Sequence, residues 1–478
     1  MFFLNIILYV SVAVAAIHPI AVVGKSFVDT VTQQQFYIKG VDYQPGGSSG
    51  AFQNFDPLSD PQTIRVYNVD SSLNHDACMT MLAAAGIYLV LDVNSPVQNR
   101  HLNRYEPWST YTKEYLNNVF QVVQQFSTYN NTLAFFAGNE IINDVLSASK
   151  SPVYVKAVVR DIKQYIRSNS PRIIPVGYSA ADDLNYRIPL TRYLECATKD
   201  STEAIDFYGV NSYQWCGEQT FYTSGYSALV DAYGCNTIQP RKFGEMRSLY
   251  SEDMNRVFSG GLIYEFTQEP NNYGLVKLLP NKNAQLLPDF HQARRQFASL
   301  PDVKNSGARR TSRPKARINP SPPKCEEQYA NIHTTKILPP CPALDLIHRG
   351  VKIKSGAYVR LTESMLKSPY KVLDVDGKSV YLESPKVEIK GTSFSDWNYQ
   401  NGMYDIDQFA GDVNVGKDTC DDSGDETCEN PNYDYDTSKL RYTSQASVEG
   451  ETGQPNLLDV FFQKINWILA YLFDADSS

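Results

Sequence analysis

The sequence lacks an excess of positive charge. Its 44 lysines and arginines are outnumbered by 52 aspartates and glutamates, which gives a formal net charge of −8. Nucleic acid and anionic membranes attract cationic surfaces, so the balance argues against either as the main partner. Internal repeats are absent as well. The acidic stretch 405–436 lacks the aspartate spacing of a calcium-binding loop, so we interpret it as a solvated charge run and expect neither a metal nor a cofactor.

Charged side chains are missing from the N-terminus. Apart from His18, no ionisable acidic or basic side chain precedes Lys25. The apolar run ends in small residues around Ala15, which predicts a signal peptide over residues 1–16 and secretion. Because the run also lacks a positive charge at its start, a membrane anchor is the alternative. Secretion permits disulfides among the eight cysteines, and the sequon at Asn130 predicts a glycan.

Tyrosine is abundant, with 32 residues. Its flat apolar ring with a polar tip suits a site for sugars or extended polar polymers, although tyrosine-rich cores also exist. Tyrosine content alone therefore favours a glycan site without excluding a packing role.

Eight short apolar segments recur along the first part of the chain, several of them almost continuous in Val, Ile, Leu, Phe and Tyr, as expected for strands buried on both faces. The segments are residues 36–44, 63–70, 88–94, 132–140, 172–180, 206–215, 228–236 and 260–268. Helical periods lie between several of them, at residues 76–86, 110–129, 152–168 and 241–257. This alternation predicts an α/β fold, a (β/α)8 barrel over residues 17–300.

Two connections of this barrel lack a helical period. Residues 44–63 show none, and only residues 216–228 join the sixth segment to the seventh. A parallel crossover needs about a dozen residues, usually as a helix. We therefore expect a barrel with two shortened crossovers.

The composition changes after the barrel. Residues 301–340 are basic and rich in Ser and Pro, which predicts a linker, and residues 341–410 have the short β-like runs of a small accessory region. An acidic loop over 411–455 and an amphipathic helix over 456–473 are expected to follow. That helix is too polar to span a membrane or to signal a lipid anchor, so we expect it on the protein or on a surface.

Barrel enzymes place their chemistry at the carboxyl ends of the strands. Here the segment "AFFAGNEIIND" ends a buried strand at Glu140, and carboxylate chemistry on sugars usually needs two such acids. The other strand ends supply Tyr43, Gln44, Arg65, Tyr67, Asp92, Asn139, Tyr178, Asn211, Tyr213, Trp215, Tyr264 and Glu265. A strand-end tyrosine is more often packing than binding, but the collection predicts a tyrosine-lined glycan cleft.

Cys216 and Cys235 follow the sixth and seventh strands, which are neighbours in a barrel. A disulfide between them would fix the edge of the site. Two unrelated thiols are the alternative.

The motifs together resemble a known family. "FYIKGVDYQ", "TIRVYNVD", "NTLAFFAGNEIIND", "DFYGVNSYQWCG" and "SGGLIYEFTQEPNNYGLV" are similar to segments of the fungal Gas/Gel/Phr proteins, the β-1,3-glucanosyltransferases of glycoside hydrolase family 72. The resemblance runs from about residue 20 to 300 in the same order. It implies a secreted (β/α)8 barrel at the cell surface or wall that cuts internal β-1,3-glucan bonds and joins the new end to another glucan chain.

The implied mechanism is retaining: one glutamate protonates the leaving oxygen and a second attacks the anomeric carbon. The resemblance makes Glu140 the acid/base and Asn139 its orienting neighbour. Tyr43, Gln44, Asp92, Tyr213 and Tyr264 correspond to positions of the glucan-binding cleft.

The nucleophile position departs from the family. The family ends its seventh strand in Phe-Ser-Glu-Tyr-Gly-Cys-Asn, whereas this chain has "LVDAYGCN", which places Ala232 at the nucleophile. A methyl group cannot attack carbon. The adjacent Asp231 should point to the opposite face of the strand, so it could act only after a one-residue slip or a bulge.

Other departures accompany this one. The family is longer at both short crossovers. The shorter first crossover of this chain lacks the family cysteine that is expected to pair with Cys78. The resemblance also implies a disulfide between Cys196 and Cys325. The family's cysteine-rich glucan-binding module and its glycolipid-anchor signal are not evident, so peripheral attachment to membrane or wall stays open.

Three hypotheses follow. The first is a monomer that binds β-1,3-glucan or supports wall assembly without transferase activity. The second is an active transferase whose sequence here lacks a segment carrying the nucleophile. The third, a structural surface protein without sugar binding, conflicts with the retained Tyr213, Trp215 and Glu140.

Overall fold

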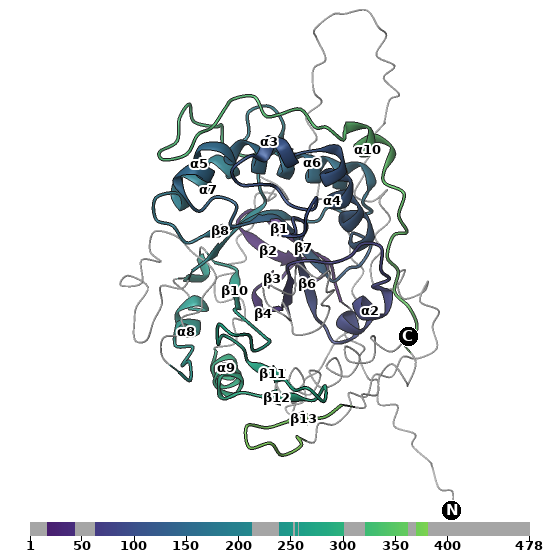
Figure 1. Ribbon diagram of the computed structural model, residues 1–478, viewed down its shortest axis with the longest axis vertical. Coiled ribbons are helices and arrows are strands. Elements are labelled where there is room, and N and C mark those ends of the chain that lie inside the picture. Colours follow the sequence, from purple (N-terminus) through teal and green to yellow (C-terminus); the bar gives the residue numbers. More distant parts are fainter. Residues whose placement is uncertain are drawn as a thin grey trace, which may run out of the picture.

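The computed structural model describes residues 17–43, 63–212, 239–251, 254–256, 258–300, 321–361 and 370–380. Within them, seven parallel strands form one curled sheet in the order β10-β4-β5-β6-β7-β8-β9 (Figure 1). The strands are β4 Ile38–Tyr43, β5 Thr63–Val66, β6 Tyr88–Asp92, β7 Thr132–Asn139, β8 Val176–Ala181, β9 Phe207–Asn211 and β10 Gly260–Ile263. Because β10 pairs with β4, the last strand meets the first, and the predicted (β/α)8 barrel is confirmed. The predicted seventh strand, 228–236, lies outside the described residues, as do both short crossovers.

The major helices cover the outer face of this sheet. They are α2 Asp76–Ala84, α4 Lys113–Phe126, α6 Pro152–Asn169, α7 Arg187–Glu195 and α9 Pro288–Ser299. Shorter pieces are α3 Pro107–Thr110, α5 Val145–Lys150, α8 Glu245–Leu249 and the 3₁₀ turns η1 Ser201–Glu203 and η2 Met254–Arg256. In β7 the first seven residues are all buried, as a strand between a barrel interior and outer helices requires. The helical periods at 76–86, 110–129 and 152–168 thus correspond to α2, α4 and α6.

The single helix predicted over 241–257 is wrong. Two tertiary constraints prevent a helix from starting at residue 241. The Arg241 guanidinium is held in a buried ion pair with Asp289 of α9 (2.6 Å), and Phe243 has a left-handed backbone conformation with φ of +53°. The helix therefore begins only at Glu245 and ends at Leu249.

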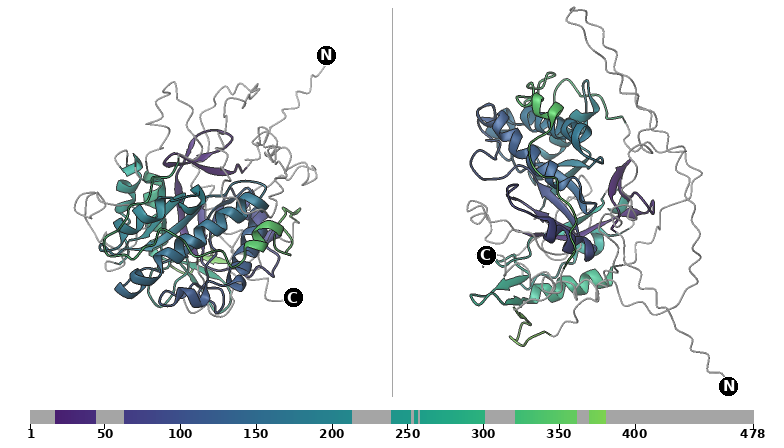
Figure 2. Two further views of the ribbon diagram at one scale, coloured as in Figure 1. Left: turned by 90° about the horizontal axis from the view of Figure 1, so that it is seen from above. Right: turned by 90° about the vertical axis from the view of Figure 1, so that its right-hand side faces the viewer.

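A small antiparallel sheet closes the amino end of the barrel. It consists of β1 Ile20–Val23, β2 Ser26–Asp29 and β3 Gln35–Phe36, drawn in purple in Figure 2. The Phe27 ring packs edge-on against Phe207, the first residue of β9 (5.4 Å between centroids), and the Tyr88 hydroxyl donates to the His18 carbonyl (2.8 Å). The carboxyl ends of the strands lie at the opposite end of the barrel, where barrel enzymes have their active sites.

The segment after the barrel packs on its outer helices. Arg160 of α6 donates to the Pro339 carbonyl (2.9 Å), α10 (Leu344–Arg349) lies against α6, and the Ala357 amide donates to Asp76 of α2 (2.8 Å). Residues 321–340, predicted as part of a linker, are therefore attached to the barrel, because their partners lie on helices far away in the sequence.

The predicted β-rich region, 341–410, is described only in part. Its described residues contain α10 and one two-residue strand, β13 (Val372–Leu373), which extends the sheet of β11 (Val276–Leu278) and β12 (Ala284–Leu286). Residues 344–349 form a helix on α6, and the β-rich region as a whole stays a prediction. The predicted signal peptide, acidic loop and C-terminal helix lie outside the described residues. Within the described ranges, no helix is long and apolar enough to cross a membrane.

Candidate active site

Glu140 stands directly after β7, at the carboxyl end of the sheet. Its amide donates to the Ser179 carbonyl of β8 (2.8 Å), and its backbone has a φ of +48°, a conformation that non-glycine residues adopt at a cost of order 1–3 kcal/mol. Such a backbone conformation persists only where the surrounding structure holds it in place, and here it turns the chain at Glu140. The side chain is half-buried.

Asn211, the last residue of β9, orients this acid. Its amide nitrogen donates to Glu140 Oε1 (2.6 Å) and to Asn139 Oδ1 (2.9 Å), and its amide oxygen accepts from the Ser179 hydroxyl (2.9 Å). An oxygen that accepts a hydrogen bond from an amide does not direct its own proton there. The proton of a neutral Glu140 is therefore favoured on Oε2.

Arg65 lies at the centre of this network. Its guanidinium donates to both carboxylate oxygens of Asp92 (3.0 and 2.9 Å) and to Asn139 Oδ1 (2.9 Å). The same group lies over the rings of Tyr67 (4.3 Å) and Phe136 (4.6 Å). Burial alone would lower the pKa of Arg65, but the charge and hydrogen bonds of Asp92, together with Tyr67 and Asp42, outweigh burial and raise the pKa, so the arginine stays a cation. Three neighbouring strands, β5, β6 and β7, are thus connected through one fixed charge.

The sequence placed Arg65 at a strand end but gave it no role. An arginine inside the apolar segment "TIRVY" was the available signal, because a buried guanidinium must find a carboxylate partner. The partner itself, Asp92, is identified only by the fold.

Two residues predicted to bind glucan are buried instead. Asp92 is 3 % exposed with both oxygens bonded to Arg65, and Tyr43 is 3 % exposed with its ring edge-on to Phe266 (5.6 Å). Asp92 pairs with Arg65, and Tyr43 packs on Phe266. A direct contact of either one with sugar remains a prediction that its burial does not favour.

Tyr264 is half-buried and follows β10. Its ring meets Tyr273 edge-on (5.3 Å), and Asn271 donates to its hydroxyl (3.4 Å) and to Glu265 Oε1 (2.9 Å). This places a predicted sugar-binding tyrosine beside a carboxyl group.

Glu265, a predicted strand-end residue, forms a second acidic region with Asp42, which the sequence did not single out. Asp42 and Glu265 are 4 % and 0 % exposed, and the Phe266 amide donates to the Asp42 carbonyl (2.9 Å). Burial is the main cause that raises the pKa of each carboxyl group to about 7. Within the described residues, Asp42 Oδ1 and Glu265 Oε2 have no hydrogen-bond partner.

Five of the remaining predicted site residues lie outside the described residues: Gln44, Tyr213, Cys216, Ala232 and Cys235. The Asn130 side chain is only 7 % exposed, which weighs against a glycan there, so its glycosylation stays a prediction. Clusters of three or more possible metal ligands are absent from the described ranges.

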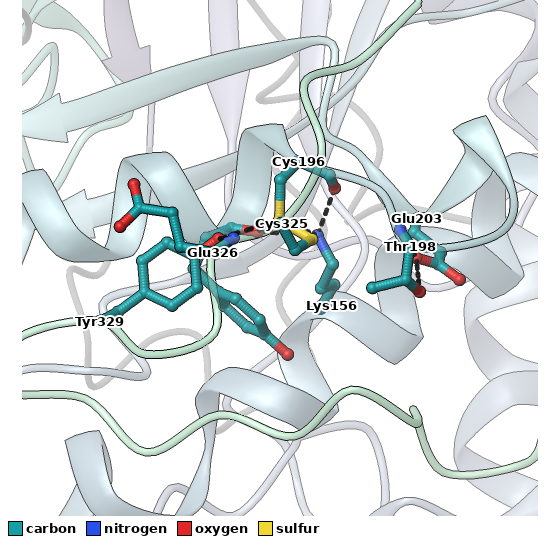
Figure 3. Close-up of a disulfide and its surroundings, with 8 residues drawn as sticks. Lys156, Cys196, Thr198, Glu203, Cys325, Glu326 and Tyr329 are labelled. Carbon is teal, nitrogen blue, oxygen red and sulfur yellow. Dashed lines mark hydrogen bonds between the residues drawn. A yellow bond between two sulfur atoms is a disulfide. The ribbon is translucent and has the colours of Figure 1, made fainter.

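The disulfide between Cys196 and Cys325 is present and links α7 to the segment that follows the barrel (Figure 3). Beside it, the buried Lys156 of α6 donates to the carbonyls of Tyr193 (2.7 Å) and Cys196 (2.6 Å). These bonds hold the end of α7 against α6.

Comparisons with known proteins agree with this architecture. The glucanosyltransferase family model of glycoside hydrolase family 72 matches residues 9–301. The chain is 49 % identical to 1,3-beta-glucanosyltransferase GAS4 of Saccharomyces cerevisiae, over 79 % of this chain and 84 % of that protein. It is 41 % identical to 1,3-beta-glucanosyltransferase gel2 of Aspergillus fumigatus, over 80 % and 83 % of the two chains.

Among solved structures, Saccharomyces cerevisiae Gas2p in complex with laminaritetraose and laminaripentaose superposes with a TM-score of 0.58 and 34 % identity. The match covers 68 % of this chain and 75 % of that one. The extent of the family match and these identities show that the chain belongs to glycoside hydrolase family 72, the glucanosyltransferases.

Proposed function

We propose that this chain is a cell-wall protein that binds β-1,3-glucan at the carboxyl ends of its barrel strands and, as written, does not transfer glucan. The observation that carries this proposal is the combination of a fully supported Glu140 with Ala232 at the nucleophile position. Relatives named 1,3-beta-glucanosyltransferases and a relative bound to laminari-oligosaccharides support the choice of ligand.

In the retaining reaction, this chain can supply the acid, Glu140, but not the nucleophile. Asn211 bonds one oxygen of Glu140 and leaves the proton to the other, from which it can pass to a glycosidic oxygen. The covalent glycosyl intermediate needs a second carboxylate about 5–5.5 Å from the first. Ala232 has no atom that can form this bond, so a bound glucan would be held without being cut.

The relatives' names, 1,3-beta-glucanosyltransferases, and the apolar N-terminal run support secretion and a location at the cell surface or wall, where β-1,3-glucan would be found. We propose that the chain acts there as a monomer, with any attachment to membrane or wall being peripheral. Retention on insoluble β-1,3-glucan, compared with retention on cellulose, tests the choice of polymer.

Transfer is tested with reduced laminari-oligosaccharides and the purified chain. The proposal expects binding and no elongated products. Longer products at rates typical of an enzyme would overturn the inactive state, and failure to bind any laminari-oligosaccharide would overturn glucan binding.

The second candidate is an active transferase whose sequence here lacks a coding segment. The two short crossovers favour it, because one of them directly precedes the nucleophile position. Sequencing the transcript across residues 226–233 distinguishes the two: a Ser-Glu pair before Tyr233 would establish the second candidate.

A further inference from the structure

Large hydrophobic side chains are exposed mainly on one end of the barrel. Ten such residues are strongly exposed within the described ranges, and six of them lie in the connections that follow strands β5 to β8, before the next major helix. These six are Leu73, Tyr105, Trp108, Val145, Leu146 and Leu184. Scattered exposed residues need no explanation, but this bias toward the end that carries Glu140 does.

Two of the connections are fastened together. The Tyr105 hydroxyl donates to Asp144 Oδ2 (2.9 Å), and the Ser151 hydroxyl donates to the Arg104 carbonyl (2.7 Å). Asp144 also accepts from the Ser147 amide (2.7 Å) and so caps α5. The α3 and α5 segments are therefore held next to each other, and we call their four exposed large hydrophobic residues, Tyr105, Trp108, Val145 and Leu146, the rim patch.

The rim patch lies close to Glu140 in the sequence. Val145 follows Glu140 by five residues, which bounds their separation to about 18 Å even in a fully extended chain. Tyr105 and Trp108 are 44 % and 52 % exposed, so each ring offers area to a ligand. The hydroxyl bond to Asp144 fixes the direction of the Tyr105 ring before any ligand arrives, which lowers the entropy cost of binding.

The chemistry of the rim patch suits a neutral, extended ligand. Aromatic rings bind the apolar C–H faces of sugar rings without needing charge. A dimer interface fits less well: a stable one buries about 800 Å² on each partner, and the exposed Glu106 lies between the two aromatic residues.

We propose that Tyr105 and Trp108 form a stacking platform for a β-1,3-glucan chain that extends beyond the residues around Glu140. This inference rests on the proposed function, since it concerns the same ligand at the same end of the barrel. The platform binds sugar units distant from the reacting bond, so it contributes to the affinity for long chains and not for short ones.

The experiment compares binding of laminaritriose and of laminaridecaose to four single variants by calorimetry. Trp108→Ala and Tyr105→Ala should each weaken binding of the long ligand by roughly tenfold, a ratio that corresponds to ~1.4 kcal/mol, and leave the short ligand unchanged. Tyr105→Phe keeps the ring and should bind the long ligand within about twofold of wild type, because the hydroxyl bond only orients the ring. Ile173→Ala is the matched control: Ile173 is also 52 % exposed but precedes β8, at the other end of the barrel.

The outcomes separate the inference from the proposed function. Equal binding of the long ligand by wild type and both alanine variants overturns the platform while leaving glucan binding intact. A Tyr105→Phe variant as weak as Tyr105→Ala overturns the stacking role of that ring. A wild-type protein that binds neither ligand overturns both proposals, and a Trp108→Ala effect seen only as a lower oligomeric state assigns the patch to a second copy of the chain.

Discussion

The two acidic regions of the site differ in how their charges are satisfied. Around Glu140, Arg65 forms an ion pair with Asp92, and the Asn211 amide nitrogen donates to both Glu140 and Asn139. Around Glu265, two buried carboxyl groups each keep one oxygen without a hydrogen bond within the described residues, and burial raises the pKa of both to about 7. The first region is connected by hydrogen bonds between β5, β6, β7 and β9, whereas the second lies on β4 and directly after β10. The difference teaches that, within the described residues, the hydrogen bonds around Glu140 come from strands β5, β6, β7 and β9.

The largest expected effect comes from restoring the missing carboxylate. If the Glu140 region is intact, Ala232→Glu should raise transfer of reduced laminari-oligosaccharides by roughly 10⁴-fold or more over the chain as written, because loss of a nucleophile costs that much or more. Product length by chromatography is the measurement. The double variant with Glu140→Gln should lose the gain; if it keeps it, Glu140 is not the acid/base.

Breaking the satisfied region should cost stability. Arg65→Met leaves the Asp92 carboxyl buried without its partner, and removal of one member of a buried pair typically costs about 3–5 kcal/mol of unfolding free energy. Denaturant unfolding measures the loss. Arg65→Lys keeps the charge and should cost less, so an equal loss in both variants would show that the planar fork, not the charge, is what the site needs.

Removing the Cys196–Cys325 disulfide tests whether the packing outside the barrel affects the region around Glu140. Replacing Cys196 and Cys325 together by Ser opens a link between residues separated by 129 positions and should lower the unfolding free energy by about 2–4 kcal/mol. Binding of laminaritriose by the folded protein should persist, since neither cysteine contacts the Glu140 network. Loss of binding at temperatures where the variant is still folded would contradict this separation.

The second acidic region should be visible in the pH dependence of stability. Glu265 has an ordinary pKa of 4.5 when unfolded and a pKa raised to about 7 when folded, so the folded state holds its proton longer. As pH rises from about 4.5 to about 7, the unfolded state binds fewer protons, and this group lowers the unfolding free energy progressively, by about 1–3 kcal/mol. Above pH 7 the effect is constant.

Glu265→Gln should make the decline smaller by the part that Glu265 contributes, because an amide does not titrate, and should leave the part that comes from Asp42. Denaturant unfolding at a series of pH values checks it, with Glu106→Gln as an exposed control that should leave the profile unchanged. A variant with the same decline as wild type would show that Glu265 is ionised in the folded state throughout.

The sequence predicted features that depend on local pattern and missed those that depend on contacts between residues far apart in the chain. Runs such as 132–140 identified their strands because burial on both faces demands continuous apolar residues, and the turn after β7 delivered Glu140 to the predicted end. The helix over 241–257 failed because the Arg241–Asp289 pair and the conformation of Phe243 depend on residues that no local pattern includes. The packing of residues 321–361 on α6 and α2 escaped for the same reason.

By itself, the sequence determined the alternation of strands and helices, the acid at the end of β7 and the substitution at residue 232, since these depend on local pattern and residue identity. Only the tertiary structure decided that Asp92 supports Arg65, that Asn211 holds Glu140, and that Asp42 and Glu265 share a buried region. Those side chains come from strands far apart in the sequence. The order and register of the parallel sheet bring them within hydrogen-bonding distance, and a hydrogen bond depends on that distance rather than on sequence separation.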